Sequence, residues 1–273
     1  MTRIPMALTI AGSDSGGGAG IQADLKTFQM RGVYGMSVIT AITAQNTRGV
    51  FDIHTVPQST VRAQIQAIAE DLPPTALKIG MLSTADIIEC VAACLQTHRL
   101  GPLVLDPVMI AKGGAPLLQQ NAIAALIACL LPQADIITPN LPEAEALTSI
   151  PITDDASAAE AAARLQALGA KSIVIKGGHS GNSQDAICRD RVFLPDRTFV
   201  LECPRFDTPH THGTGCTFSA CITAELAKGH RMEAAIRSAK AFITAAISQP
   251  LNIGSGHGPV NHWACQTNGP VLG

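Results

Sequence analysis

Short apolar runs typical of β-strands alternate with amphipathic helical patterns along almost the whole chain. The strand-like runs cover residues 7–11, 38–43, 77–82, 103–105, 136–138 and 172–176. Between them, apolar residues recur at helical spacing, as in the series Ile87, Val91 and Leu95. Helices are also expected at 158–168, 217–228 and 232–248, and short antiparallel strands at a sheet edge within 184–203. This order predicts an α/β fold, a doubly wound and mostly parallel central sheet with helices on both faces.

Composition narrows the class of protein. Of the 273 residues, 47% are hydrophobic but only 3% are aromatic, so the expected core is aliphatic and rich in alanine. Because no linker or charge block interrupts the pattern, residues 1–273 are expected to form a single domain. The net charge of −2 and the absence of a basic run argue against a nucleic-acid partner. No signal peptide or apolar run of membrane-spanning length is evident, which predicts a cytoplasmic protein without a membrane partner.

The eight cysteines do not form a metal-binding or disulfide pattern. No Cys-x-x-Cys pair occurs, and we expect reduced thiols. Cys90 and Cys94 share a helix face and would make two metal ligands, but no second pair accompanies them, so packing is favoured.

Two glycine-rich segments precede expected helices. The first contains five glycines within residues 12–20, and Asp24 lies one helical turn further on. It matches neither the G-x-G-x-x-G nor the Walker A spacing, and its alternatives are a flexible turn or a close approach of backbone to a ligand. Asp24 would then point toward that ligand or support the helix N-terminus.

The second segment, residues 211–216, reads Thr-His-Gly-Thr-Gly-Cys and opens directly onto a helical pattern. Backbone N–H groups at a helix N-terminus bind anions, and the helix dipole is expected to lower the pKa of Cys216. The alternative is a helix cap in which Cys216 packs as a small apolar residue.

Further polar residues follow other strands, and the carboxyl ends of parallel strands are where ligands bind in such sheets. Asp106 is placed for Mg²⁺ or substrate, and Lys176 for a phosphate. Asn140 and Glu143 have capping-box spacing, a structural role that competes with a place beside a metal-bound phosphate. Carboxylates, a lysine and two glycine loops at strand ends together fit Mg–nucleotide chemistry.

Several motifs, in order, resemble the hydroxymethylpyrimidine (phosphate) kinases of thiamine biosynthesis, members of the ribokinase-like superfamily. The matching segments span essentially the whole chain: 11–14, 20–26, 43–47, 106–109, 138–144, 176–179, 211–217 and 256–262. The resemblance implies a single-domain ribokinase-like fold. It also implies ATP-dependent phosphorylation of 4-amino-5-hydroxymethyl-2-methylpyrimidine, then of its monophosphate, and a homodimer.

The same resemblance implies roles for individual residues. Gln45 would bind the aminopyrimidine edge, with Asp24 and the Gly12 backbone nearby. ATP and Mg²⁺ would be bound by the following residues: Asn140, Glu143, Lys176 and Thr214, with Asp106 and Glu143 as candidate metal ligands. The anion hole over the transferring phosphoryl group would comprise Gly213, Thr214, Gly215 and Cys216. Cys216 would accept the hydroxyl proton, while His212 is a competing base or a residue that positions the loop.

Two residues depart from what many relatives carry beside the phosphate path: His210 in place of Asn, and Gly113 in place of Ser. Three rival functions remain at this point. They are a pyridoxal kinase of the same fold, a cysteine-dependent hydrolase using Cys216 with His212, and a non-enzymatic small-molecule binding protein.

Overall fold

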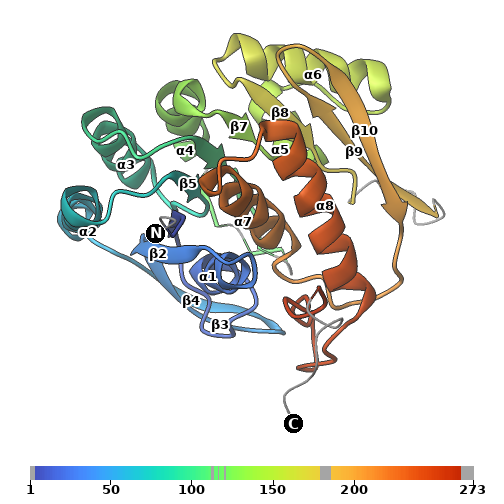
Figure 1. Cartoon of the computed structure of the whole chain (residues 1–273), viewed down its shortest axis with the longest axis horizontal. Coiled ribbons are helices and arrows are strands. Elements are labelled where there is room, and N and C mark those ends of the chain that lie inside the picture. Colours follow the sequence, from blue (N-terminus) through green and yellow to red (C-terminus); the bar gives the residue numbers. More distant parts are fainter. Residues whose placement is uncertain (1–3, 112–113, 116, 120, 179–185, 266–273) are drawn as a thin grey trace.

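The computed structural model describes residues 4–111, 114–115, 117–119, 121–178 and 186–265, and its centre is an eight-stranded sheet (Figure 1). The strand order is β10-β9-β8-β7-β6-β5-β1-β2. The strands from β8 to β2 in this order run parallel to one another. The strands of this sheet are β1 (Met6–Ala11), β2 (Tyr34–Ile39), β5 (Ala76–Ile79), β6 (Leu103–Leu105), β7 (Ile136–Ile137), β8 (Ser172–Ile175), β9 (Ile187–Phe193) and β10 (Thr198–Pro204).

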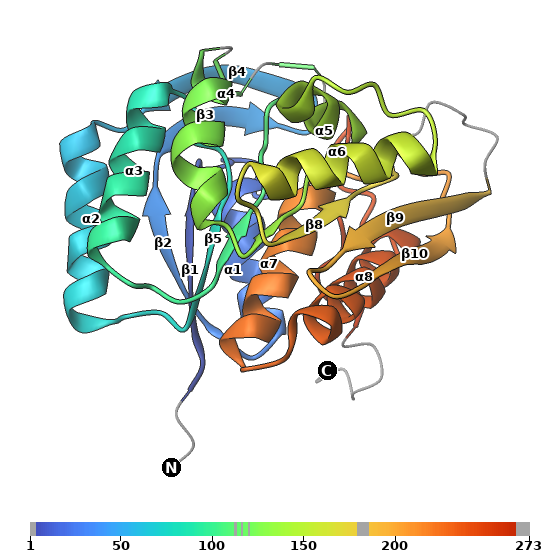
Figure 2. The ribbon, with the colours of Figure 1, turned by 90° about the horizontal axis from the view of Figure 1, so that it is seen from above.

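Helices cover both faces of the sheet, as expected for parallel strands that are buried on both sides. One face carries α1 (Gly20–Met30), α7 (Thr214–Ala227) and α8 (Met232–Ser248). The other carries α2 (Gln58–Asp71), α3 (Ala85–Thr97), α4 (Ala122–Ala125), α5 (Leu141–Thr148) and α6 (Asp155–Ala167) (Figure 2). Among the described residues, no helix has both the length and the apolar character needed to cross a bilayer.

The central strands are buried throughout because their side chains are almost all aliphatic. Every residue of β5, β6, β7 and β8 is buried, including the lysine Lys78. Antiparallel β9 and β10 at the edge instead alternate buried and exposed positions, so the edge hairpin expected within 184–203 is confirmed.

The prediction of a single strand at 38–43 is wrong. The chain leaves the main sheet at Thr40, whose N–H donates to the Ala11 carbonyl at 3.0 Å, and continues into a separate two-stranded sheet. That sheet pairs β3 (Ala41–Asn46) with β4 (Gly49–Thr55). An unbroken β-type run contains no turn residue to mark such a change of sheet, so the apolar pattern alone did not reveal it.

Candidate active site

The polar motifs meet at the carboxyl ends of the parallel strands. The chain passes from β1 outward to β2 and then returns to the opposite side of β1 as β5, so the strand order reverses between β1 and β5. Ligands in open α/β sheets bind at such a reversal. Gly12 follows β1 there, and a Cβ on it would lie 3.0 Å from the sulfur of Met81, which follows β5.

The two glycine-rich segments lie against each other. Gly213 is the N-cap of α7 with φ +82°, and a Cβ on it would overlap the carbonyl oxygen of Gly18. A Cβ on Gly18 would in turn lie 2.5 Å from the His212 ring. Only glycine allows this contact between two backbones, and it brings the N-termini of α1 and α7 together.

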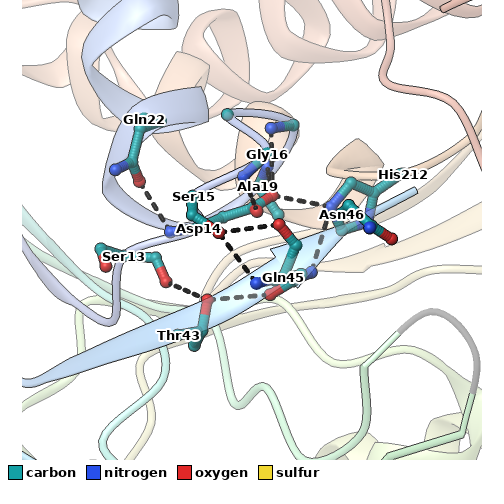
Figure 3. A network of polar contacts seen from close by, with 12 residues as sticks. Ser13, Asp14, Ser15, Gly16, Ala19, Gln22, Thr43, Gln45, Asn46 and His212 are labelled. Atoms are coloured by element: carbon teal, nitrogen blue, oxygen red, sulfur yellow. Dashed lines mark hydrogen bonds and ion pairs between the residues drawn. The ribbon is translucent and has the colours of Figure 1, made fainter. Parts of the chain in front are cut away.

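Asp14 joins the two segments through hydrogen bonds (Figure 3). Its carboxylate accepts from the N–H groups of Gly16, Gly18 and Ala19 at 2.8, 3.0 and 2.8 Å. Its Oδ2 also lies 2.8 Å from Nε2 of His212. Burial alone would raise the pKa of the Asp14 carboxyl, but the His212 hydrogen bond and the backbone donors hold that pKa below its usual value. Asp14 therefore fixes the first loop as an anionic anchor.

Gln45 of β3 approaches the same histidine. Its Nε2 is 3.3 Å from Nε2 of His212, and its Oε1 is 3.3 Å from Oγ1 of Thr43. One imidazole nitrogen carries either a hydrogen or a lone pair, so it can serve Asp14 or the Gln45 amide group but not both. The half-buried Gln45 amide is thus held loosely and has hydrogen-bonding capacity left for a ligand.

Asp24 lies deeper than a residue that touches ligand directly. It is fully buried, and its two oxygens are 2.6 Å from Nζ of Lys78 and 2.6 Å from Oγ1 of Thr9. Burial raises the pKa of the Asp24 carboxyl, while the Lys78 ammonium opposes that shift. Lys78 is itself fully buried, and despite desolvation its pKa stays raised because of Asp24, Cys216 and Asp106. The pair brings the positive charge of Lys78 and the negative charge of Asp24 close to Cys216.

The expected lowering of the pKa of Cys216 is wrong. Burial raises the pKa of this thiol to about 11, and the nearby Asp24 and Asp106 carboxylates add to the effect. Lys78 and the Gly20 backbone N–H act in the opposite direction without overcoming it. The free protein consequently holds Cys216 as a thiol at neutral pH, because desolvation of the thiolate outweighs the Lys78 charge and the Gly20 N–H.

Asp106, which is buried, and Lys176, which is partly buried, form a second pair below the start of α7. Nζ of Lys176 is 3.1 Å from Oδ1 of Asp106, and Ser219 Oγ donates to Oδ2 at 3.1 Å. Burial would raise the pKa of Asp106, but the two lysines Lys176 and Lys78 keep it lowered. A Cβ on Gly215 would lie 3.2 Å from Nζ of Lys176, so the first turn of α7 rests directly on this pair.

Asn140 and Glu143 form the capping box of α5. The Glu143 N–H donates to Oδ1 of Asn140 at 2.9 Å, and the Asn140 N–H donates to Oε2 of Glu143 at 2.8 Å. The helix-capping role predicted from the spacing of these two residues is therefore confirmed. Burial raises the pKa of Glu143 to about 7, with Lys176 lowering it and Asp106 raising it. Glu143 therefore also belongs electrostatically to the Asp106–Lys176 pair.

These carboxylates fit a magnesium ion held jointly with phosphates. Within the described ranges, no three His, Cys, Asp or Glu side chains converge as a self-contained metal centre. Mg²⁺ bound through phosphates needs only one or two carboxylates, and Asp106 and Glu143 provide hard oxygen ligands beside a lysine suited to a phosphate.

His210, one of the two departures, is packed against the chain's closing motif. A Cβ on Gly258 would overlap Nδ1 of His210, and this buried nitrogen has no hydrogen-bond partner among the described residues. The other departure, Gly113, lies outside the described residues, as does His179 of the Lys176 motif.

Sequence reasoning missed Lys78 and Asp14 as members of the site. Lys78 had a usable signal, a lysine between leucine and isoleucine in a strand expected to be buried. Asp14 was hidden inside the glycine-rich loop, where an aspartate is an ordinary turn residue.

The comparisons with known proteins agree with this geometry. The sequence profile of the family described as phosphomethylpyrimidine kinase matches residues 14–261. A hydroxymethylpyrimidine/phosphomethylpyrimidine kinase of Haemophilus influenzae is 66% identical, over 97% of this chain and 98% of its own length.

Solved structures show the same fold. The ADP complex of Bacillus subtilis pyridoxal kinase is 42% identical, with a TM-score of 0.88 over 97% of this chain and 100% of that one. A phosphomethylpyrimidine kinase from Clostridium difficile 630 is 44% identical, with a TM-score of 0.79 over 90% of this chain and 100% of that one. The sheet, its abutting glycine loops and the lysine–carboxylate pairs define a small-molecule kinase of the ribokinase-like fold. The chain belongs to the phosphomethylpyrimidine kinase family.

Proposed function

We propose that the protein transfers the γ-phosphoryl group of ATP to the hydroxymethyl group of 4-amino-5-hydroxymethyl-2-methylpyrimidine, and then a second phosphoryl group to the monophosphate, in thiamine biosynthesis. The observation that carries this proposal is the first turn of α7 resting on Asp106 and Lys176. A Cβ on Gly215 would meet Nζ of Lys176 at 3.2 Å and Oδ2 of Asp106 at 3.7 Å. Backbone donors and a lysine thus face the same small volume, which suits a phosphoryl group in transfer.

The nucleotide side comprises residues after β6, β7 and β8. Lys176 binds phosphate oxygens as a point charge, and Thr214 with the N–H groups of Gly213, Gly215 and Cys216 forms the anion hole. Among the residues that the structure describes, no side chain caps the N-terminus of α7, so no such cap consumes these donors. Asp106 and Glu143 would hold Mg²⁺, which neutralises charge on the phosphates when bound, while Asn140 keeps Glu143 oriented.

The pyrimidine side comprises residues after β1 and on β3. Gln45 hydrogen-bonds the amino and ring-nitrogen edge of the pyrimidine, and the Gly12 backbone approaches the ring. Because Asp24 is fully buried and paired with Lys78, we propose it as a positioning residue that acts through the lysine and Cys216. The thiol of Cys216, once deprotonated, accepts the hydroxyl proton as the new P–O bond forms.

The decisive experiment follows phosphorylation of the synthetic pyrimidine by mass spectrometry with ATP and Mg²⁺ in excess. Successive appearance of the monophosphate and diphosphate is expected. If no phosphorylated pyrimidine forms, the proposed activity is wrong. The second candidate function is pyridoxal phosphorylation, which the 42% identical pyridoxal kinase structure favours. Pyridoxal is assayed in parallel, and the two rates are compared.

A Gln45→Leu variant should raise KM for the pyrimidine by about 10- to 100-fold and leave KM for ATP unchanged. The reason is the loss of one or two hydrogen bonds that leaves polar ligand atoms unpaired. Steady-state kinetics with each substrate varied in turn measure the effect. Asn46→Ala is the matched control, because this neighbouring amide is exposed and serves only the Arg48 N–H in the described structure. An equal rise in KM in both variants would remove Gln45 from the pyrimidine site.

We further propose that residues 1–273 act as one kinase domain, in the cytoplasm, and as a homodimer. Ile42 and Phe51, on the small β3–β4 sheet, are 54% and 66% exposed and offer apolar surface for a second copy. Phe51→Asp is expected to convert a dimer into monomers, measured by sedimentation equilibrium. A wild-type chain that sediments as a monomer at micromolar concentration would disprove the dimer.

A further inference from the structure

Two cysteines outside the phosphoryl-transfer site lie directly opposite each other in the edge hairpin. Cys188 of β9 is the register partner of Cys203 of β10, so their side chains are neighbours on one face of the hairpin. Directly opposite residues in an antiparallel pair have Cα atoms about 4.5–5.5 Å apart. That separation lies within the roughly 4.4–6.8 Å range spanned by disulfides. The backbone already meets the distance requirement for a bond between them.

The surroundings of the pair distinguish its two sulfurs. Both residues are partly exposed and face α8, on the same side of the hairpin as buried Asp190. Lys240 of α8 binds Asp190 at 2.7 Å, and its positive charge also acts on Cys203. The neighbouring Cys188 side chain lowers the pKa of Cys203, burial opposes this shift, and the Lys240 ammonium assists it. The neighbouring Cys203 side chain, together with burial, raises the pKa of Cys188. Cys203 is therefore the thiol that attacks, and Cys188 the one that resolves.

The cysteine pair is also connected to Gly177 and Gly178, which directly follow the proposed phosphate-binding residue Lys176. The Gly177 N–H donates to Oδ1 of Asp190 at 3.0 Å, and Arg205 donates to the Gly178 carbonyl at 3.2 Å. A Cβ on Gly178 would lie 3.9 Å from Sγ of Cys188, and one on Gly177 would overlap the Arg189 carbonyl. Gly177 and Gly178, the two described residues that follow Lys176, thus pack directly on the strand segment that carries Cys188.

We propose that Cys188 and Cys203 form a reversible oxidation site, in which exchange with a small-molecule disulfide links the two sulfurs. Formation of this disulfide alters ATP binding through Gly177 and Gly178, which follow Lys176. The coupling half of this inference rests on the proposed function. In the first step the Cys203 thiolate attacks one sulfur of the reagent, forming a mixed disulfide and releasing one thiolate. Cys188 then loses its proton to solvent, attacks Sγ of Cys203 and expels the second thiolate. The protein dithiol loses two electrons, and the reagent disulfide gains them as two thiols.

The test exposes the full-length protein to glutathione buffers of increasing oxidised-to-reduced ratio, followed by alkylation and peptide mapping. A 188–203 link is expected at a lower ratio than any modification of the buried pair Cys90 and Cys94, which is the matched control. Burial and Cys90 raise the pKa of Cys94. The proposal is overturned if Cys188 and Cys203 stay reduced while other cysteines are modified, whether exposed Cys265 or the buried pair Cys90 and Cys94.

Single variants test which sulfur attacks. Cys188→Ser is expected to accumulate a glutathione adduct on Cys203, whereas Cys203→Ser should leave Cys188 largely unmodified. The reverse pattern would contradict the assignment. The wild-type peptide map decides the link itself, even if a variant folds poorly.

Coupling is read from KM for ATP in fully linked and dithiothreitol-reduced enzyme. A reversible change of about threefold or more is expected on linking, and none in the Cys188→Ser/Cys203→Ser variant under the same treatment. A linked enzyme with unchanged KM for ATP would refute the coupling. If no kinase activity exists, the mapping result still stands or falls on its own.

Discussion

Replacing Gly213 with alanine should abolish measurable phosphoryl transfer and lower the melting temperature. The residue has φ +82°, which costs a non-glycine residue about 1–2 kcal/mol, and its Cβ would overlap the Gly18 carbonyl oxygen. Relief of the overlap must move a backbone, since neither partner has a side chain to rotate. The movement would separate the N-termini of α1 and α7, and with them the anion hole from the first glycine loop.

Gly229→Ala is the matched control at the opposite end of α7. Gly229 has φ +85°, but a Cβ there would meet no atom of the described residues within 4 Å. It should therefore show only the backbone cost, about 1–2 kcal/mol in free energy of unfolding by urea titration, with kcat unchanged. Equal losses of kcat in the two variants would mean that the contact between the two loops has no special role.

Cys216→Ala should lower kcat by about 10²- to 10⁴-fold, the range expected for a general base, with little change in pyrimidine binding. The raised pKa gives this prediction a second readout. With a pKa of about 11, the reactive thiolate fraction rises about tenfold per pH unit below that value. Wild-type kcat/KM for the pyrimidine should therefore increase steadily from pH 7 to 9, and the residual activity of the alanine variant should not.

Cys221→Ala is the matched control for Cys216. Cys221 is on the same helix, is fully buried in the cluster between α7, α8 and the sheet, and its thiol pKa is raised to about 12. It should keep kcat within about twofold and lose some stability through the removed packing volume. A Cys216→Ala enzyme with near-wild-type turnover, or a wild-type pH profile that is flat, would exclude Cys216 as the proton acceptor.

The raised pKa of Cys216 also bears on the rival hydrolase. A cysteine hydrolase needs a thiolate paired with a histidine, but Nε2 of His212 lies near Asp14 and Gln45. The charges identified around Cys216 are those of Lys78, Asp24 and Asp106. This environment holds Cys216 as a protonated thiol in the free protein, and no histidine is paired with it as a cysteine hydrolase requires among the contacts of the described residues.

Local patterns determined the parts of the structure in which neighbours in sequence decide the outcome. The helix expected at 232–248 is present with the same bounds, because its amphipathic period is uninterrupted. The capping box at Asn140 and Glu143 is present because both partners lie within one turn. The carboxyl-end positions of Asp106 and Lys176 followed from the alternation of strands and helices, and their 3.1 Å contact agrees with it.

Tertiary structure alone decided the features that depend on distant segments and on burial. The exit of the chain from the main sheet at Thr40 placed Gln45 beside His212, 167 residues away in sequence. The contact between Gly18 and Gly213 depends on the strand reversal at β1 and β5, which no local pattern encodes. The sequence by itself determined the fold class and placed Asp106, Asn140 and Lys176 at the sheet's carboxyl edge, since both follow from apolar periodicity. The protonation of Cys216 was decided only by tertiary structure, because desolvation and the field of Lys78, Asp24 and Asp106 depend on positions in space and not on spacing along the chain.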